Sequence, residues 1–164
     1  MYHATPYDIS ATGFYFETYE EYCTKAKTHT NEYGDIVEEY EIQFIDGDNH
    51  ELFGALSINQ VNLKQWFYDF ENLENEQTAK ATYLANDIGY SIEDILHRLD
   101  DVTLFEGAAK DYAEQFIEDT DMLQGLPDNL RYYFDTEAYA RDLLAGGDIT
   151  EVTIMGTAYV AMGG

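Results

Sequence analysis

The stretch KDYAEQFIEDTDML, residues 110–123, contains an amphipathic helix whose two faces differ in charge. At about 100° per residue, Ala113, Phe116 and Ile117 fall on one side, with Tyr112 nearby. The acids that share a band roughly 80° wide on the other side are Asp111, Glu114, Glu118 and Asp121. Like-charge pairs in this band destabilise the helix by about 1 kcal/mol in total. The pattern predicts a helix from about residue 108 to 120 that packs by one face and exposes an acidic one.

The acid excess extends along the whole chain of 164 residues, which carries 33 Asp and Glu against 8 Lys and Arg and has a net charge of −25. Such self-repulsion destabilises any compact state. A hydrophobic content of 45% still predicts a folded chain rather than a disordered one. Direct binding to nucleic-acid phosphates or to an anionic membrane requires a basic patch, and the eight bases do not cluster. We therefore expect neither direct nucleic-acid binding nor a membrane partner.

The compartment is predicted from two further observations. The single cysteine, Cys23, cannot form an internal disulfide and gives no indication of an oxidising compartment. The start MYHATPYD lacks the basic and apolar segments of a signal peptide, and no apolar run approaches 18 residues. These features favour a cytoplasmic protein.

The segments beside the acidic helix predict a mixed C-terminal part. VTLFE (residues 102–106) is typical of a short strand, and Pro127 suits the first turn of a helix. Asp135 is a good N-cap for the next helix, which Gly146 and Gly147 end. EVTIM and TAYVAM, parted by Gly156, predict a terminal hairpin. The hairpin around residues 154–160 is a candidate dimer interface.

The first two thirds of the chain differ from each other in their periodicity. GFYF (residues 13–16) and YEIQFID (40–46) predict strands, and TYEE (18–21) predicts a capped helix running to about residue 29. DGDN (46–49) predicts a turn to a partner strand around ELFGAL (51–56). From about residue 59 apolar residues recur at helical spacing. They predict one helix over residues 63–73, a second through residues 83–88 that stops at Gly89, and a third opened by SIED (91–94). We expect an elongated α+β chain of three small modules, residues 1–57, 58–101 and 102–164.

Catalytic and metal-binding patterns are missing from the sequence. His3, His29, His50 and His97 stand alone, without metal-ligand spacing, and there is no nucleophile elbow, P-loop or dinucleotide-binding motif. DGDNHELFGALS faintly resembles a calcium loop, but Glu51 stands where that loop needs glycine. We expect a protein that is not an enzyme and needs no metal or other cofactor.

The size of the charge favours an interaction with DNA-binding proteins. B-DNA carries one charge per about 1.7 Å of axis, so a net charge of −25 matches roughly 40 Å of duplex. Such a surface attracts proteins that bind DNA through the electrostatic steering that attracts DNA itself. An acidic structural or interaction domain, adapted to high salt, would have a similar composition, and this alternative stays open.

One fifth of the chain resembles a known family. AEQFIEDTDML (residues 113–123), GLP (125–127), NLRYYFD (129–135) and AYARDL (138–143) follow the C-terminal pattern of ArdA-type antirestriction proteins. In that pattern an acid-rich helix and a Val-Pro or similar step precede an aromatic-acid segment ending in Ala-Tyr-Gly-Arg-Asp-Leu. Ala140 replaces the glycine of this ending, and Gln124-Gly125 replaces a Gly-acid pair.

The resemblance implies an elongated homodimer that mimics bent duplex DNA. Such proteins occupy the DNA-binding groove of type I restriction–modification enzymes, are carried on plasmids, transposons and phages, and use no cofactor. Carboxylates would stand in for phosphates. The acids predicted to do so are Asp111, Glu114, Glu118, Asp119, Asp121, Asp128, Asp135, Glu137 and Asp142.

The segment LRYYFDTEAYARDLLAGGD, residues 130–148, is interpreted as scaffold beside that surface. Tyr132, Phe134, Tyr139 and Leu143 are expected to pack. Two ion pairs are predicted from a spacing of four residues, Arg131 with Asp135 and Glu137 with Arg141.

Overall fold

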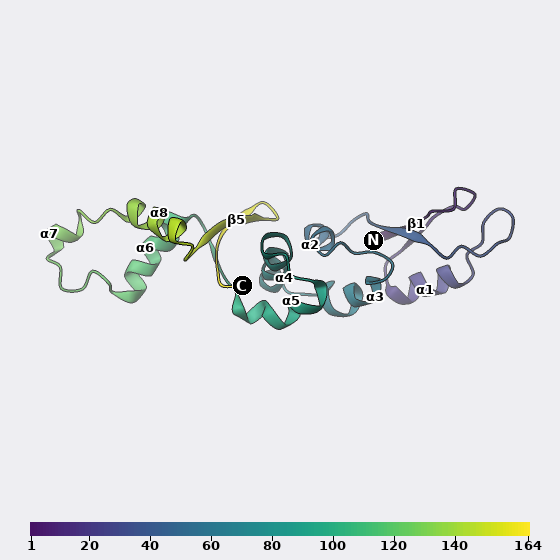
Figure 1. The fold of residues 1–164 in the computed structure, drawn as a ribbon, viewed down its shortest axis with the longest axis horizontal. Helices are drawn as coiled ribbons and strands as arrows, with labels where there is room; N and C mark the ends of the chain where they lie inside the picture. The colour runs from purple at the N-terminus through teal and green to yellow at the C-terminus, as the bar shows by residue number, and fades with distance from the viewer.

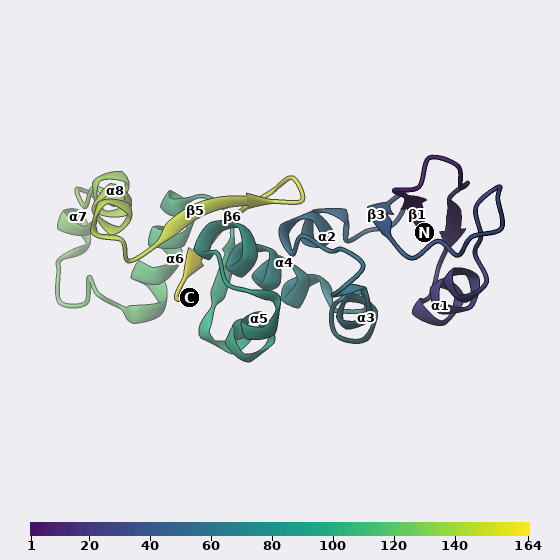
Figure 2. The ribbon, with the colours of Figure 1, turned by 45° about the vertical axis from the view of Figure 1, so that its right-hand side comes forward.

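The computed structural model describes residues 1–164 and has an elongated α+β fold, as expected from the sequence. The chain runs from a small sheet at one end, through a group of short helices, to a second small sheet and a helix pair at the other end (Figures 1 and 2). Each sheet has three antiparallel strands, in the orders β2-β1-β3 and β4-β6-β5.

The N-terminal sheet is built around a strand that the sequence pattern does not predict. Its members are β1 (Tyr2–Pro6), β2 (Phe14–Phe16) and β3 (Tyr40–Phe44). Tyr2 of the central strand pairs with Phe16 on one side and with Phe44 on the other. The predicted strands β2 and β3 are confirmed. β1 lies between them and forms backbone hydrogen bonds with both.

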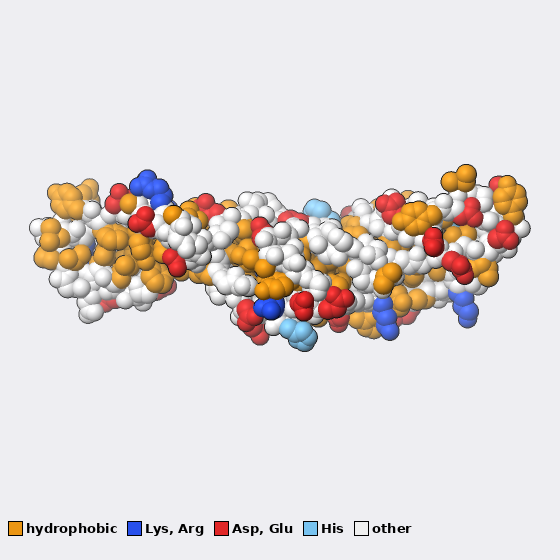
Figure 3. All heavy atoms as spheres, in the orientation of Figure 1, with side chains coloured by type: hydrophobic (Ala, Val, Ile, Leu, Met, Phe, Trp, Pro, Cys, Tyr) orange, Lys and Arg blue, Asp and Glu red, His pale blue; other side chains and the backbone are white.

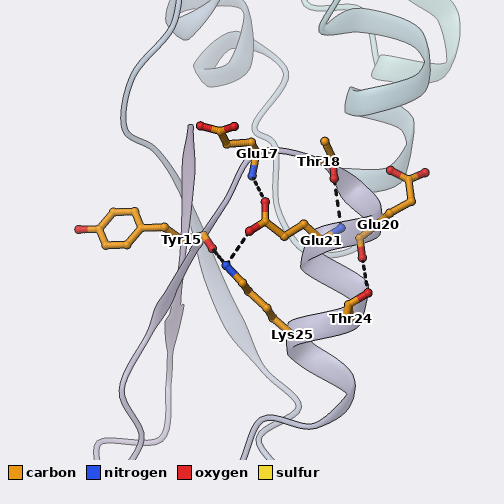
Figure 4. Close-up of polar contacts among 7 residues, drawn as sticks. All are labelled: Tyr15, Glu17, Thr18, Glu20, Glu21, Thr24 and Lys25. Atoms are coloured by element: carbon orange, nitrogen blue, oxygen red, sulfur yellow. Dashed lines mark hydrogen bonds and ion pairs between the residues drawn. The ribbon is translucent and has the colours of Figure 1, made fainter.

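Helix α1 (Tyr19–Lys27) begins where TYEE predicts it. The Thr18 hydroxyl accepts a hydrogen bond from the Glu21 backbone N–H at 3.1 Å, as expected of an N-cap. The Glu21 carboxylate accepts from the Glu17 N–H at 2.8 Å and from Lys25 Nζ at 2.6 Å. The hydrogen bond from Lys25, and to a smaller extent that from Glu17, lowers the pKa of Glu21. Figure 4 shows the Glu17 and Glu20 carboxylates pointing away from this network.

The predicted hairpin after DGDN is wrong, because the segment forms helix α2 (His50–Ala55). Leu52, Phe53 and Leu56 are buried together, which requires helical rather than alternating spacing. β3 pairs with β1 on one side and remains the edge strand of the sheet on the other. A short apolar run is compatible with a strand or a helix, and burial of Leu52, Phe53 and Leu56 on one face makes this segment a helix.

The middle of the chain is helical, as predicted. Its elements are α3 (Leu63–Gln65), η1 (Trp66–Phe70), α4 (Asn75–Tyr83), η2 (Leu84–Ile88), α5 (Ile92–Arg98) and η3 (Leu99–Asp101). Two of them are π-helical turns: the Glu71 N–H donates to the Trp66 carbonyl at 2.9 Å, and Gly89 N–H donates to Leu84 at 3.0 Å. Gly89 ends η2 at a φ of 88°, a conformation that favours glycine.

The C-terminal part confirms the predicted order of elements. They are β4 (Thr103–Glu106), α6 (Ala109–Thr120), α7 (Asp128–Arg131), α8 (Thr136–Gly146), β5 (Thr150–Ile154) and β6 (Thr157–Met162). Gly147 ends α8 at a φ of 77°. Within the hairpin Ile154 and Val160 are buried, whereas Met155, Gly156 and Ala158 are exposed, and its role as a dimer interface stays a prediction.

A core cluster of 23 buried residues extends from the N-terminal sheet through the middle helices to β5 and β6. At its centre Trp66 Nε1 donates to the Tyr2 hydroxyl at 2.9 Å, and that hydroxyl donates to the Glu71 carboxylate at 2.9 Å. Burial raises the pKa of both Tyr2 and Glu71. A second cluster of five joins α6, α8 and the hairpin through Ala109, Ala113, Ala140, Ile149 and Val160. The division into three modules stays a prediction.

Candidate partner-binding surface

Helix α6 has the two faces that its sequence predicts. Ala113 is fully buried, while Tyr112, Phe116 and Ile117 are half-buried. Tyr112 makes an edge-on contact with Phe105 of β4, with ring centroids 5.6 Å apart, and α6 packs along α8. All nine acids predicted to contact a partner are exposed on α6 or in the segments that follow it.

Three of the predicted acids are brought together in a groove of about 500 Å³. Asp111, Glu114 and Glu118 line it from α6, and Thr136 lines it from the start of α8. The remaining lining residues are Phe105, Gln115 and Ile117. The groove therefore combines two apolar side chains with three carboxylates and can receive cationic side chains.

Asp111 also has a structural role at the start of α6. Its carboxylate accepts a hydrogen bond from the Ala108 N–H at 2.9 Å. Ala108 has no side-chain acceptor of its own, and Glu151 of β5 accepts from the next N–H, that of Ala109, at 2.8 Å. The two carboxylates together satisfy free N–H groups at the positive end of the helix.

One lysine lies among the predicted acids. Lys110 Nζ is 3.3 Å from the Glu137 carboxylate of α8 and 3.9 Å from that of Glu114. The predicted pair of Glu137 with Arg141 is therefore wrong, because Glu137 faces α6 rather than the next turn of its own helix. The pairing is exposed, so we expect it to contribute little to stability.

The predicted pair of Arg131 with Asp135 is also wrong. Arg131 is the last residue of α7, whereas Asp135 precedes α8, so the two do not share a helix face. Arg131 Nε instead donates to the Leu126 carbonyl at 3.1 Å. Tyr132, which was expected to pack, is exposed beside Tyr133 because the chain here forms the end of the elongated body (Figure 1). Phe134, Tyr139 and Leu143 are half-buried, as expected.

The other predicted acids do not line the groove. Asp119 accepts a hydrogen bond from Gln115 at 2.8 Å, and Asp121 ends α6 at a φ of 52°. Asp128 is the first residue of α7, and Asp142 is exposed on α8. Asp135 caps α8, since its carboxylate accepts from the Ala138 N–H at 2.9 Å.

Replacement of Asp135 by alanine is expected to lower the free energy of unfolding by about 1 kcal/mol, because the Ala138 N–H loses its acceptor. Asp135→Ser keeps a capping oxygen and should retain most of the stability. Asp142→Ala removes an exposed acid of the same helix that makes no hydrogen bond and should change stability by less than about 0.5 kcal/mol. Urea unfolding followed by circular dichroism measures all three; equal effects of D135A and D142A would contradict the capping role.

Several acids outside the predicted set hold distant segments together. The Glu51 carboxylate of α2 accepts from the Met155 N–H in the hairpin turn at 2.6 Å. Glu20 of α1 accepts from the Tyr68 hydroxyl at 3.1 Å. Burial, and then the nearby Glu51, raise the pKa of Asp87. These contacts join residues far apart in sequence, so no local pattern could have identified them.

The exposed acids extend over the whole body. Figure 3 shows Asp and Glu side chains along most of the visible face, with a few Lys or Arg side chains between them and mainly hydrophobic side chains at the end that carries α7. The net charge of −25 is therefore spread along an elongated shape rather than confined to the groove. None of the helices combines the length and the apolar character that a membrane crossing requires.

The fold and this surface define an elongated, highly acidic α+β protein with an exposed carboxylate-lined groove. A family model described as "Antirestriction protein (ArdA)" matches residues 7–156. The chain therefore belongs to the ArdA family of antirestriction proteins. The family consists of inhibitors rather than enzymes. No curated protein matches the chain.

Proposed function

We propose that this protein is a DNA mimic that occupies the DNA-binding groove of type I restriction–modification enzymes and blocks their action on DNA. The observation that carries the proposal is the exposed acidic face of α6, whose Glu114 and Glu118 line one groove in an elongated body of net charge −25. Membership of the ArdA family supports the antirestriction activity.

In this mechanism the carboxylates take the places of phosphates. Lysines and arginines of the target groove would pair with Asp and Glu oxygens by charge-assisted hydrogen bonds. Glu114, Glu118 and Asp119 are the strongest candidates, since Asp111 and Asp135 already accept backbone hydrogen bonds. DNA and inhibitor then compete for one site, which would block restriction and, where methylation uses the same groove, methylation too.

The organisation of the chain suits an extended mimic. We propose three modules, residues 1–57, 58–101 and 102–164, arranged along the long axis, and a cytoplasmic homodimer as the active form. One chain matches the charge of roughly 40 Å of duplex, and a dimer would match twice that length. A homodimer would therefore cover most of an extended DNA-binding site.

The direct test is cleavage of unmodified DNA by a purified type I endonuclease with and without the protein. Inhibition that excess duplex DNA relieves is expected. A protein that leaves cleavage unchanged at a large molar excess over the enzyme would contradict the proposal.

Salt is expected to weaken binding to the enzyme at least ~10-fold between about 50 mM and about 200 mM NaCl, because the proposed contacts are ionic. Titration calorimetry at several salt concentrations measures the slope, and a flat profile would exclude the mechanism.

The salt-adapted alternative is tested by thermal melting in the same buffers. A DNA mimic stays folded in dilute buffer, whereas a salt-adapted domain unfolds there.

A further inference from the structure

Two loops at the end of the body opposite α7 present apolar side chains to solvent. They follow β1 (residues 7–13) and connect α1 to β3 (residues 28–39), and they lie together at the end of the long axis in both ribbon views (Figures 1 and 2). The exposed side chains there, which we call the distal patch, are Tyr7 (65%), Ile9 (102%), Tyr33 (77%) and Ile36 (67%). Single exposed apolar residues are common, but here four lie on two adjoining loops, and two of them, Tyr7 and Ile36, line one groove, which indicates an interaction site.

The two loops are bonded to each other by one aspartate. The Asp8 carboxylate accepts from the Ser10 N–H at 2.9 Å, from the Ser10 hydroxyl at 2.6 Å and from Asn31 Nδ2 at 2.9 Å. The Glu32 N–H donates to the Ser10 carbonyl at 3.0 Å. The hydrogen bonds from Ser10 and then Asn31 lower the pKa of Asp8. The loops therefore hold the patch in one arrangement, which reduces the entropy lost when a partner binds.

Two residues of the patch line a groove that combines apolar and acidic side chains. A groove of about 210 Å³ is lined by Tyr7, Ile36 and Val37 together with Asp8, Glu38 and Glu39. Glu32 and Asp35 are exposed in the same loop, and no Lys or Arg occurs between Lys27 and Lys64. Figure 3 shows apolar and acidic side chains side by side at this end.

This combination selects a cationic partner with exposed planar or apolar groups. Carboxylates attract lysine and arginine, and a tyrosine ring accepts a guanidinium over its face. A second acidic copy of this chain would place the carboxylates of two such grooves against each other and be repelled.

We propose that the distal patch is a second contact with the cationic DNA-binding surface of the restriction–modification enzyme, supplying apolar and cation–π contacts that a phosphate backbone does not offer. The inference rests on the proposed function and adds a contact to it. The acids of α6 give binding most of its salt dependence, whereas the apolar side chains of the distal patch add affinity that salt weakens little.

The test compares Ile9→Ser/Ile36→Ser with Val61→Ser, which removes another side chain that is 93% exposed, in titrations of a purified type I enzyme. The double variant should bind about tenfold more weakly than the wild type with an unchanged salt slope. Val61→Ser should bind like the wild type. Tyr33→Phe should retain more affinity than Tyr33→Leu, because only phenylalanine keeps the ring face.

The outcomes separate this inference from the proposed function. A wild type that does not bind the enzyme contradicts the proposed function itself. Wild-type binding by Ile9→Ser/Ile36→Ser, with an unchanged melting temperature, overturns the distal contact alone. A change in molar mass of the double variant in light scattering would also overturn it, by showing that the patch joins two copies of the chain.

Discussion

Replacing Trp66 with alanine is expected to lower the free energy of unfolding by about 3–5 kcal/mol, the largest effect of any single substitution we propose. The side chain is fully buried and makes an edge-on contact with Phe53, with ring centroids 5.2 Å apart. Its Nε1 also donates to the Tyr2 hydroxyl. Alanine leaves a cavity where the β1 strand meets the middle helices and removes the hydrogen bond that joins them.

Tyr2→Phe separates the contribution of the Trp66–Tyr2 hydrogen bond to stability from that of the packing around Trp66. It keeps the ring but leaves Trp66 Nε1 without an acceptor inside the core, which should cost about 1–3 kcal/mol. Trp66 is the single tryptophan, so its fluorescence cannot follow its own replacement, and urea unfolding is measured by far-ultraviolet circular dichroism. A loss below about 1 kcal/mol for W66A would contradict a shared core at this position.

The helices of the C-terminal part could be predicted because their signals are local. Periodicity placed α6 within a residue of its bounds, and the Asp135 cap and Gly147 fix the ends of α8. Neither inference needs knowledge of any other segment. Local capping chemistry and the 3.6-residue period together determine where these helices lie.

Strand β1 could not be predicted, because its evidence lies in other strands. Only Tyr2 and Ala4 give it an alternating buried face, and Pro6 ends it. It becomes a central strand through its pairing with β2 and β3. The same reason accounts for α2, where the partner of β3 turned out to be β1 rather than the following segment.

The acidic face of α6 could be predicted, but the partners of individual acids could not. A spacing of four residues suggested that Glu137 pairs along its helix, whereas Lys110 of α6 lies closer to it. Glu151 of β5 accepts from the Ala109 N–H at the start of α6, a contact between segments 42 residues apart that no local pattern indicates. Sequence spacing identifies which residues share a helix face. Packing between elements determines which acids remain available to bind a partner.

Neutralising three exposed acids of α6 is expected to weaken inhibition of a type I enzyme by roughly 10- to 100-fold. The variant Glu114→Gln/Glu118→Gln/Asp119→Asn removes three carboxylates that are exposed on one helix. Each lost ion pair with the target should cost about 0.5–1 kcal/mol. Stability should not fall, because the substitutions relieve repulsion between like charges four residues apart.

The matched control Glu74→Gln/Glu93→Gln/Asp100→Asn removes the same number of charges from exposed positions in the middle helices, so both variants change the net charge from −25 to −22. If α6 is the contact surface, the control should stay within about threefold of the wild type, because more distant charges are screened at moderate salt. Equal weakening of both variants would mean that charge acts diffusely and that the α6 site is wrong. No weakening of either would contradict phosphate mimicry itself, since a mimic must lose affinity when its charges are removed.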